Sequence, residues 1–259
     1  SLDELLGFLS HANLVVRTHA THQLVHRIGQ PAGQRIKAML ADGLGAEQRA
    51  HGLWVLARLG VLDVQTIHQL AADDQRLVRV HLMKALAEKP EWQDEERSHA
   101  RRALTDDDAF VRRAAVEALG RHPHPGDIKL LIDLWEGADN ADTHLIHATR
   151  IALRNAIEQL NNLPALASRY DGQASYLARL ANICLGIKSA QSAQFLLNYR
   201  QDVKPEEERL GEEIHHIGRY LNRQSLPAFY RFVNEFGKNP ETVRLTVFNA
   251  AYRSAQERG

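Results

Sequence analysis

The chain has 259 residues, 44% of them hydrophobic and 25% charged, which is typical of a folded protein. Its 32 lysines and arginines balance its 32 aspartates and glutamates. Proteins that bind nucleic acid broadly, or that attach to anionic membranes, usually carry a basic excess, so we expect neither partner. The sequence contains no apolar run long enough to cross a membrane, so membrane insertion is not expected.

The single cysteine, Cys184, excludes an internal disulfide and favours a cytoplasmic protein. It lies in an apolar helical stretch, where we interpret it as a small core residue rather than a nucleophile. The first residue is Ser1 rather than methionine, which is compatible with a fragment or a processed form.

Helical periodicity runs along the whole chain, and no strand-like alternation of useful length interrupts it. Eight shorter helices are expected at 2–9, 32–40, 64–70, 93–104, 127–135, 163–169, 190–199 and 226–236. Turns rich in Asp or Asn follow the first five of these helices, at His11-Ala12-Asn13, Asp42-Gly43, Asp73-Asp74, Asp106-Asp107 and Asp139-Asn140. Each turn is expected to lead into a second, longer helix.

The clearest second helix is the stretch TDDDAFVRRAAVEALG, from Thr105 to Gly120. Asp108 or a neighbouring aspartate is expected to cap this helix by accepting hydrogen bonds from its first amides. Apolar residues then recur at helical spacing on one face, at Val111, Ala115, Ala118 and Leu119. This pattern predicts a helix with one buried stripe.

A Val-Arg pair or a lone arginine marks the start of most second helices, at Arg17, Arg49, Arg79, Arg112, Arg209 and Arg244. Weaker copies centred on His147 and Ala178 fill the gap, so the period is roughly 30 to 35 residues, the size of one helical hairpin. We therefore predict an all-α, right-handed α-solenoid of about eight hairpins. Residues 1–259 form a single domain in this prediction, with regular repeats at 1–125 and more divergent ones at 126–259.

The Asp-x-x-x-x-Val-Arg motif, followed by a helix rich in Ala and Leu, resembles the HEAT repeat in its short, phycobilisome-lyase-like form. The resemblance is strong over residues 1–125 and weak after them. It implies that aspartates and arginines bridge adjacent repeats in a ladder. The residues assigned to this ladder are Arg17, Arg49, Asp74, Arg79, Asp107 and Arg112, with Asp73 and Asp106 as the neighbouring carboxylates.

A narrower resemblance covers Arg49 to Glu88, which looks like the HEAT segment of large multidomain bacterial proteins. In those proteins the segment lies between a sugar-dehydrogenase-like propeller and a c-type haem domain. The resemblance implies that this chain is a structural segment of an exported, periplasmic oxidoreductase. Neither neighbouring domain is present in the sequence.

Histidine is unusually frequent, and three copies lie two positions after the marker arginine, at His19, His51 and His81. A row of imidazoles that hydrogen-bond to neighbouring groups is the favoured interpretation, because this helical phase lies between repeats. A metal site is the alternative: His22 and His26, with His19, have chelating spacing but need a further ligand. His144 with His147 has the same weakness, and His122, His124, His215 and His216 are interpreted as turn and surface residues.

Catalytic motifs are missing from the sequence: there is no phosphate-binding glycine loop, no nucleophile elbow and no Cys-x-x-Cys-His. HEAT-like di-iron hydroxylases need His-Glu pairs, and no His-Glu dipeptide occurs. We therefore predict a non-catalytic scaffold without cofactor or metal. A HEAT-like lyase or metal-dependent enzyme with a histidine-lined concave face is the alternative.

Positions four and five after the marker arginine are expected to face the concave, partner-binding side. The binding candidates are His22, Trp54, Met83, Lys84, Arg113 and Glu117. Trp54 is the best contact candidate, because tryptophan is enriched at binding hot spots, although packing in the core or between repeats is the favoured interpretation of this residue. The expected partner is a protein or a neighbouring domain of the same chain, bound by a monomer.

An aromatic cluster lies near the C-terminus, at Phe229, Tyr230, Phe232 and Phe236. We expect it to pack the last hairpin, with docking of a neighbouring domain as the alternative.

Overall fold

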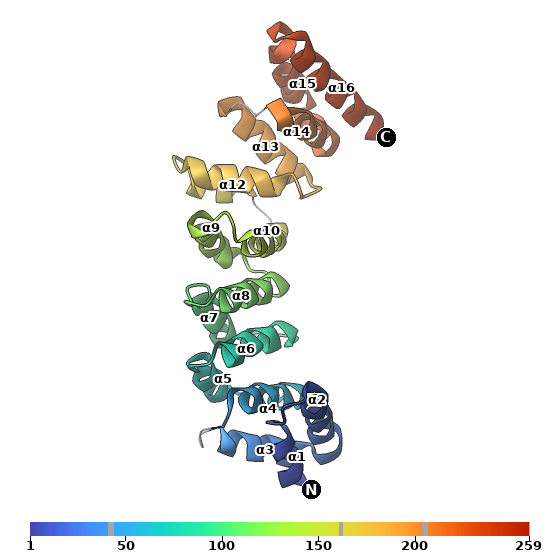
Figure 1. The fold of residues 1–259 in the computed structure, drawn as a ribbon. Helices are drawn as coiled ribbons and strands as arrows, with labels where there is room; N and C mark the ends of the chain where they lie inside the picture. The colour runs from blue at the N-terminus through green and yellow to red at the C-terminus, as the bar shows by residue number, and fades with distance from the viewer. Residues whose placement is uncertain (41–43, 161–162, 204–206, 259) are drawn as a thin grey trace. The chain divides into compact units, whose positions relative to one another are not determined.

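The computed structural model describes residues 1–40, 44–160, 163–203 and 207–258, and every regular element in these ranges is helical (Figure 1). Sixteen α-helices in the described residues follow one another as eight hairpins. The prediction of an all-α solenoid is therefore confirmed. The predicted turn at Asp42-Gly43 lies outside the described residues.

Contacts divide the chain into two compact units, Ser1–Ala152 and Leu153–Gly259, with the boundary inside α10. The first helices of the hairpins in unit 1 are α1 (Leu2–Phe8), α3 (Gln30–Met39), α5 (Val64–Ala71), α7 (Asp94–Ala103) and α9 (Ile128–Gly137). The second helices are α2 (Leu14–Gln23), α4 (Ala46–Arg58), α6 (Arg76–Glu88), α8 (Ala109–Arg121) and α10 (Thr143–Glu158). A π-helical turn, Leu24–Ile28, extends α2, and a 3-10 turn, Pro125–Asp127, precedes α9.

Unit 2 continues with the hairpins α11 (Leu163–Arg169) and α12 (Ala174–Cys184), α13 (Ala190–Asp202) and α14 (Glu207–Tyr220), and α15 (Leu226–Glu235) and α16 (Glu241–Glu257). Short 3-10 turns, Arg223–Ser225 and Phe236–Lys238, flank α15. The first helices of all eight hairpins begin and end within three residues of the predicted ranges.

Short polar side chains begin several of the helices. Asp108 accepts hydrogen bonds from the amides of Phe110 and Val111, at 2.8 and 3.4 Å, and thereby caps α8 as predicted. Asn13 caps α2 by accepting from the Val15 amide at 2.8 Å. These caps satisfy amides that have no partner inside the helix.

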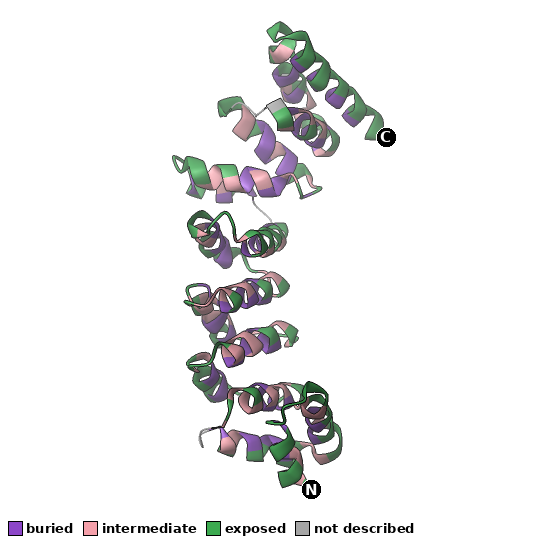
Figure 2. Cartoon of the chain, viewed as in Figure 1, coloured by how far each residue is buried: buried purple, intermediate pink, exposed green. Residues whose placement is uncertain are grey.

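The core of unit 1 is formed by the inward faces of successive second helices, which pack α4 on α2, α6 on α4 and α8 on α6 (Figures 1 and 2). On α8, Val111, Ala115, Ala118 and Leu119 are at most 1% exposed, as the periodicity predicted. A Cβ on Gly120 would lie 3.3 Å from the Cα of Ala152, so this glycine allows α8 and α10 to approach closely.

In unit 2 the core side chains include Cys184, whose thiol is fully buried. Burial raises the pKa of Cys184, which disfavours the reactive thiolate, as expected of a core residue. In the predicted aromatic cluster, Phe229 and Phe232 are buried, whereas Tyr230 is exposed. None of the described helices has both the length and the apolar character that crossing a membrane requires.

Candidate functional site

The marker arginines join successive repeats of unit 1. Arg49 donates to both carboxylate oxygens of Asp73, at 2.6 and 2.8 Å, and Arg79 donates to both oxygens of Asp106, at 2.8 and 3.0 Å. The Nη1 of Arg79 also donates to the carbonyl of Asp73 in its own turn, at 2.8 Å. Each guanidinium therefore holds the turn of its own repeat and the aspartate of the next, and this two-sided binding fixes the stacking of α4, α6 and α8.

The main carboxylates of the ladder are Asp73 and Asp106, each bound through both oxygens. Of the two aspartates assigned from the sequence, Asp74 also accepts from Arg49 but through one oxygen, and Asp107 contributes no carboxylate contact to the ladder among the described residues. Asp74 is largely exposed, reaching Arg49 only at 3.3 Å, and Asp107 offers Arg112 its backbone carbonyl. The difference between the two aspartates of each turn comes from a hydrogen bond within the turn. The first aspartate of each turn accepts from an amide two residues later, which holds its carboxylate toward the preceding repeat.

The ladder changes partners at its two ends. Arg112 donates to the carbonyls of Asp106 and Asp107 in its own turn and to no carboxylate among the described residues. Its neighbour Arg113 binds Asp142 of the next repeat at 2.8 Å. At the other end, Arg17 binds an imidazole instead of a carboxylate, because its Nε donates to Nε2 of His51 at 3.2 Å.

His51 is held as a neutral imidazole. Its Nε2 accepts from Arg17, and its Nδ1 lies 3.0 Å from Oγ1 of Thr21, whose proton already goes to the Arg17 carbonyl. The proton of the imidazole therefore sits on Nδ1. Burial first, and then the positive charge of Arg17, lowers the pKa of His51 from 6.5 to about 4.

His81 holds the indole of Trp54. The Nε1 of Trp54 donates to Nδ1 of His81 at 2.9 Å, and the two rings meet edge to face with centroids 6.1 Å apart. Burial, followed by the charge of Lys84, lowers the pKa of His81, which keeps Nδ1 free to accept. His19, the third member of the predicted row, is exposed, so the row has two structural members rather than three.

We expect unit 1 to lose stability as the pH falls from about 6.5 to 5. The folded-state pKa of His51 lies below its ordinary value, so in this range the unfolded chain binds a proton that the folded chain does not, and stability falls with pH. The check is the urea midpoint from tryptophan fluorescence at pH 7, 6 and 5. His51→Gln removes this group but leaves His81, whose pKa is also lowered, so the stability curve should become shallower without becoming flat. Equal slopes for both proteins would contradict the assignment.

The surface of the second helices carries one side chain per repeat at the fifth position after each marker arginine. We call this set the outer row: His22, Trp54, Lys84 and Glu117. His22, Lys84 and Glu117 are exposed, and Trp54 is half-buried. The fourth positions, including the binding candidate Met83, are buried, so Met83 is a packing residue and not a contact residue. A single step of 100° around the helix separates the two sets.

A cleft of about 320 Å³ adjoins Trp54, between the C-terminal parts of α4 and α6. Its lining residues are Trp54, Ala57, Arg58, Gly60, Leu62, Ala85, Leu86, Glu88, Lys89 and Pro90. Gly60 has φ +70°, a conformation that favours glycine, and this turn ends α4 beside the cleft. The guanidinium of Arg58 lies 5.6 Å from the centre of the Trp54 ring, within cation–π range. Trp54 therefore has its N–H bound, its ring faced by a cation, and open space beside it.

The other predicted site residues lie apart from this cleft. Arg113 is half-buried, bound to Asp142 and stacked 5.4 Å from the centre of the Phe110 ring, so it is a structural residue. His22 and His26 face each other with centroids 6.1 Å apart, but within the described ranges no group of three His, Cys, Asp or Glu side chains could hold a metal ion.

His216 was interpreted as a surface residue, and this is wrong. Its side chain is buried against Ser192, with Nε2 3.3 Å from the hydroxyl, and burial lowers its pKa to about 4. Helix α14 packs against both α13 and α16, so its buried arc is wide enough to include this position.

Two buried carboxylates form ion pairs that the sequence did not predict. Asp127, at 1% exposure, accepts from Arg97 and Arg101 of α7 at 2.6 Å each. In unit 2, Arg200 donates to both oxygens of the buried Glu213, at 2.5 and 2.6 Å. Asp127 follows Pro-Gly, which reads as an ordinary turn, and Arg200 and Glu213 belong to different helices, so no local pattern reveals either pair.

The family model described as HEAT repeats matches residues 64–154. The chain is also similar to solved structures of engineered and designed proteins. An engineered protein shares 14% identity at a TM-score of 0.46, over 100% of this chain and 79% of that one. A second engineered protein shares 13% identity at a TM-score of 0.33, over 100% and 97% of the two chains. A designed armadillo repeat protein shares 14% identity at a TM-score of 0.33, over 97% and 99%.

These structural likenesses are too low to support any inference about binding. No curated protein matches the chain. The residues that the family model matches, 64–154, form the hairpins from α5 to α8, helix α9 and most of α10 in the structure. The described residues therefore form an all-α solenoid of helical hairpins, and residues 64–154 within it match the HEAT-repeat model.

Proposed function

We propose that the chain is a non-catalytic scaffold that binds a protein partner through the outer row of unit 1, with Trp54 as the main contact. The observation that supports this function is the combination at Trp54: an indole fixed by His81, a cation at its ring, and a cleft of about 320 Å³ beside it. A side chain already held in one conformation loses little entropy on binding.

The charges around Trp54 support a protein partner rather than nucleic acid. Arg58 and Lys84 are exposed on successive second helices, but Glu88 and Glu117 are exposed beside them. A mixed rim around an aromatic contact is typical of protein interfaces, whereas a nucleic-acid surface needs an uninterrupted basic stripe. We accordingly propose no nucleic-acid partner, and a monomer as the binding form.

We expect Trp54→Ala to weaken partner binding by about 2 kcal/mol or more, roughly 30-fold in Kd, because it removes both the indole and one wall of the cleft. The immobilised chain recovers the partner from its native source, and calorimetry then gives Kd for each variant. Tyr252→Ala is the matched control, since it removes an exposed aromatic residue from unit 2. Unchanged affinity in Trp54→Ala, or a larger loss of affinity in Tyr252→Ala, would contradict the proposal that Trp54 is the main contact.

The partner on the outer row can also be a neighbouring domain of the same polypeptide. The resemblance of residues 49–88 to HEAT segments of multidomain bacterial proteins supports this form of the proposal, with a redox parent and export to the periplasm. Reading the flanking parts of the open reading frame tests it. A propeller before the segment and a Cys-x-x-Cys-His motif after it are the expected findings, and unrelated flanking sequence would reject it.

A further inference from the structure

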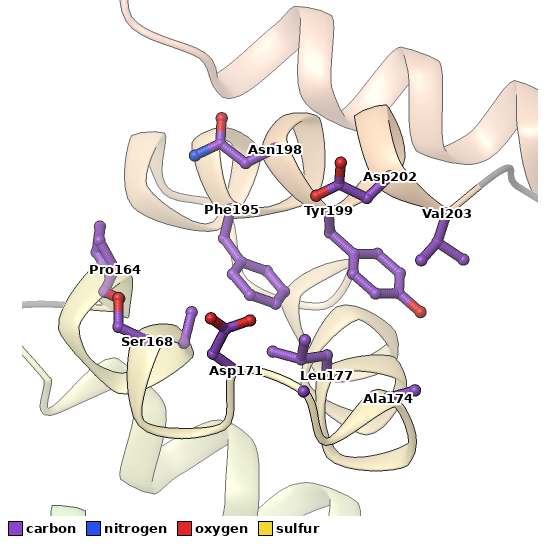
Figure 3. A pocket seen from close by; sticks show the side chains of 12 residues that line it. Pro164, Ser168, Asp171, Ala174, Leu177, Phe195, Asn198, Tyr199, Asp202 and Val203 are labelled. Carbon is purple, nitrogen blue, oxygen red and sulfur yellow. The ribbon is translucent and has the colours of Figure 1, made fainter.

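A second pocket, of about 440 Å³, lies in unit 2 between α11, α12 and α13 (Figure 3). This volume falls within the range of about 300–1,000 Å³ that is usual for ligand pockets. Its walls are mainly apolar, formed by Pro164, Ala167, Leu177, Phe195 and Val203. The pocket is distinct from the outer row of unit 1, so an inference drawn from it does not depend on the function proposed above.

Among the described residues, the charged side chains that line the pocket are Asp171 and Asp202. Both are exposed, and Figure 3 shows the Asp171 carboxylate turned toward Phe195 and Leu177, with Asp202 beside Tyr199. Neither carboxylate forms an ion pair with another residue in the described part of the chain. The described part of the lining therefore carries two negative charges and no cationic side chain, beside apolar walls.

An aromatic wall adds to the attraction for cations. Phe195 and Tyr199 lie on successive turns of α13, with ring planes 8° apart and centroids 6.1 Å apart. Arg200 lies near Tyr199, 4.9 Å from its ring centre, but both its Nε and its Nη2 are bound to Glu213. Its charge is thus neutralised within the fold, and it does not serve the two pocket carboxylates.

We propose that this pocket binds an arginine or lysine side chain from a segment of a partner polypeptide. The hydrocarbon stem lies against Leu177 and Val203, and the cationic head lies between Asp171 and Asp202. The aromatic wall contributes a cation–π attraction. The pocket is larger than one side chain requires, which leaves room for the residues on either side of the basic one.

Calorimetry with the full chain tests this assignment. The probe is the peptide acetyl-Ala-Leu-Arg-Leu-Ala-amide, and its analogue with citrulline keeps the shape but not the charge. We expect the citrulline peptide to bind at least about tenfold more weakly, and the Asp171→Asn, Asp202→Asn double variant to lose at least about tenfold in affinity for the arginine peptide. Both carboxylates are exposed, so folding should be retained, and circular dichroism checks this.

The matched control is the double variant Glu212→Gln, Glu235→Gln, which removes the same charge from exposed positions of unit 2 outside the pocket and should bind like wild type. Trp54→Ala should also bind the peptide normally, which separates this site from the outer row. Equal binding of the arginine and citrulline peptides, or unchanged affinity in the pocket variant, overturns the proposal. Butylguanidinium binding as tightly as the peptide overturns the assignment to a polypeptide.

Discussion

Asp127→Ala is expected to destabilise unit 1 by about 3 kcal/mol, the lower end of the cost of breaking a buried ion pair. Asp127 is 1% exposed and accepts from both Arg97 and Arg101, so its removal leaves two guanidinium groups facing an empty site. Arg97 also donates to the carbonyl of His122, so the turn before α9 loses part of its support. Arg101 is about one third exposed and can recover water, which keeps the loss from being larger.

The unfolding free energy in urea measures this effect, with two probes. Trp54, Trp92 and Trp135 all lie in unit 1, so fluorescence reports that unit, whereas circular dichroism reports both units. Asp107→Ala is the control: its side chain is exposed, and we expect a loss below about 0.5 kcal/mol. A loss below 1 kcal/mol for Asp127→Ala would show that the buried pair is not a main support of the unit.

The same experiment tests the proposal that residues 1–259 unfold as a single domain. If they do, Asp127→Ala shifts the fluorescence and circular-dichroism transitions together, because both units share one cooperative transition. Separate transitions, with only the fluorescence curve displaced, would show two independently stable units that meet inside α10.

Gly218→Ala is expected to destabilise unit 2 by about 2 kcal/mol, because an added methyl group overpacks the contact between α14 and α16. A Cβ at this position would lie 2.1 Å from Oγ and 2.8 Å from Cβ of Ser254, and 2.9 Å from Cζ of Phe229. Both neighbours are buried, so the helices must move apart. The higher helix propensity of alanine, up to about 1 kcal/mol, offsets only part of this cost.

Chemical denaturation followed by circular dichroism measures the change. Adding Ser254→Gly removes the two closest atoms and should recover part of the loss, although the contact with Phe229 remains. The control is Gly7→Ala in α1, where a Cβ meets no atom within 4 Å and stability should be unchanged or slightly higher. A neutral Gly218→Ala, or no recovery in the double variant, would contradict the overpacking argument.

Local sequence patterns were sufficient for the repeat, the helices and the arginines of the ladder. Hydrophobic spacing and capping act within one or two helical turns, so Asp108, Val111 and Leu119 could be assigned without knowledge of any neighbour. The marker arginines recur because every second helix must bind the turn before it, and that requirement is also local.

Local patterns could not decide which of two adjacent residues is buried or bound by a neighbouring repeat. Asp73 and Asp74 have the same chemistry, and only the packed repeats decide that Asp73 binds Arg49 through both oxygens whereas Asp74 reaches it through one. Met83 and Lys84 differ by one step around α6, and the width of the buried arc, set by packing against both α4 and α8, places Met83 inside the core. The expectation that His216 is a surface residue failed for the same reason, because a helix covered on two sides buries more than a single stripe.

The sequence by itself therefore determined the helical class, the repeat of hairpins and the positions of the helices, since these depend on interactions between residues close in the chain. Only the tertiary structure decided which carboxylates bind the arginines, that Asp127 joins two guanidinium groups, and that Trp54 is fixed by His81 beside a cleft. It alone also placed Asp171 and Asp202 around one pocket. These contacts join residues from different helices, whose distances and orientations depend on how the hairpins pack.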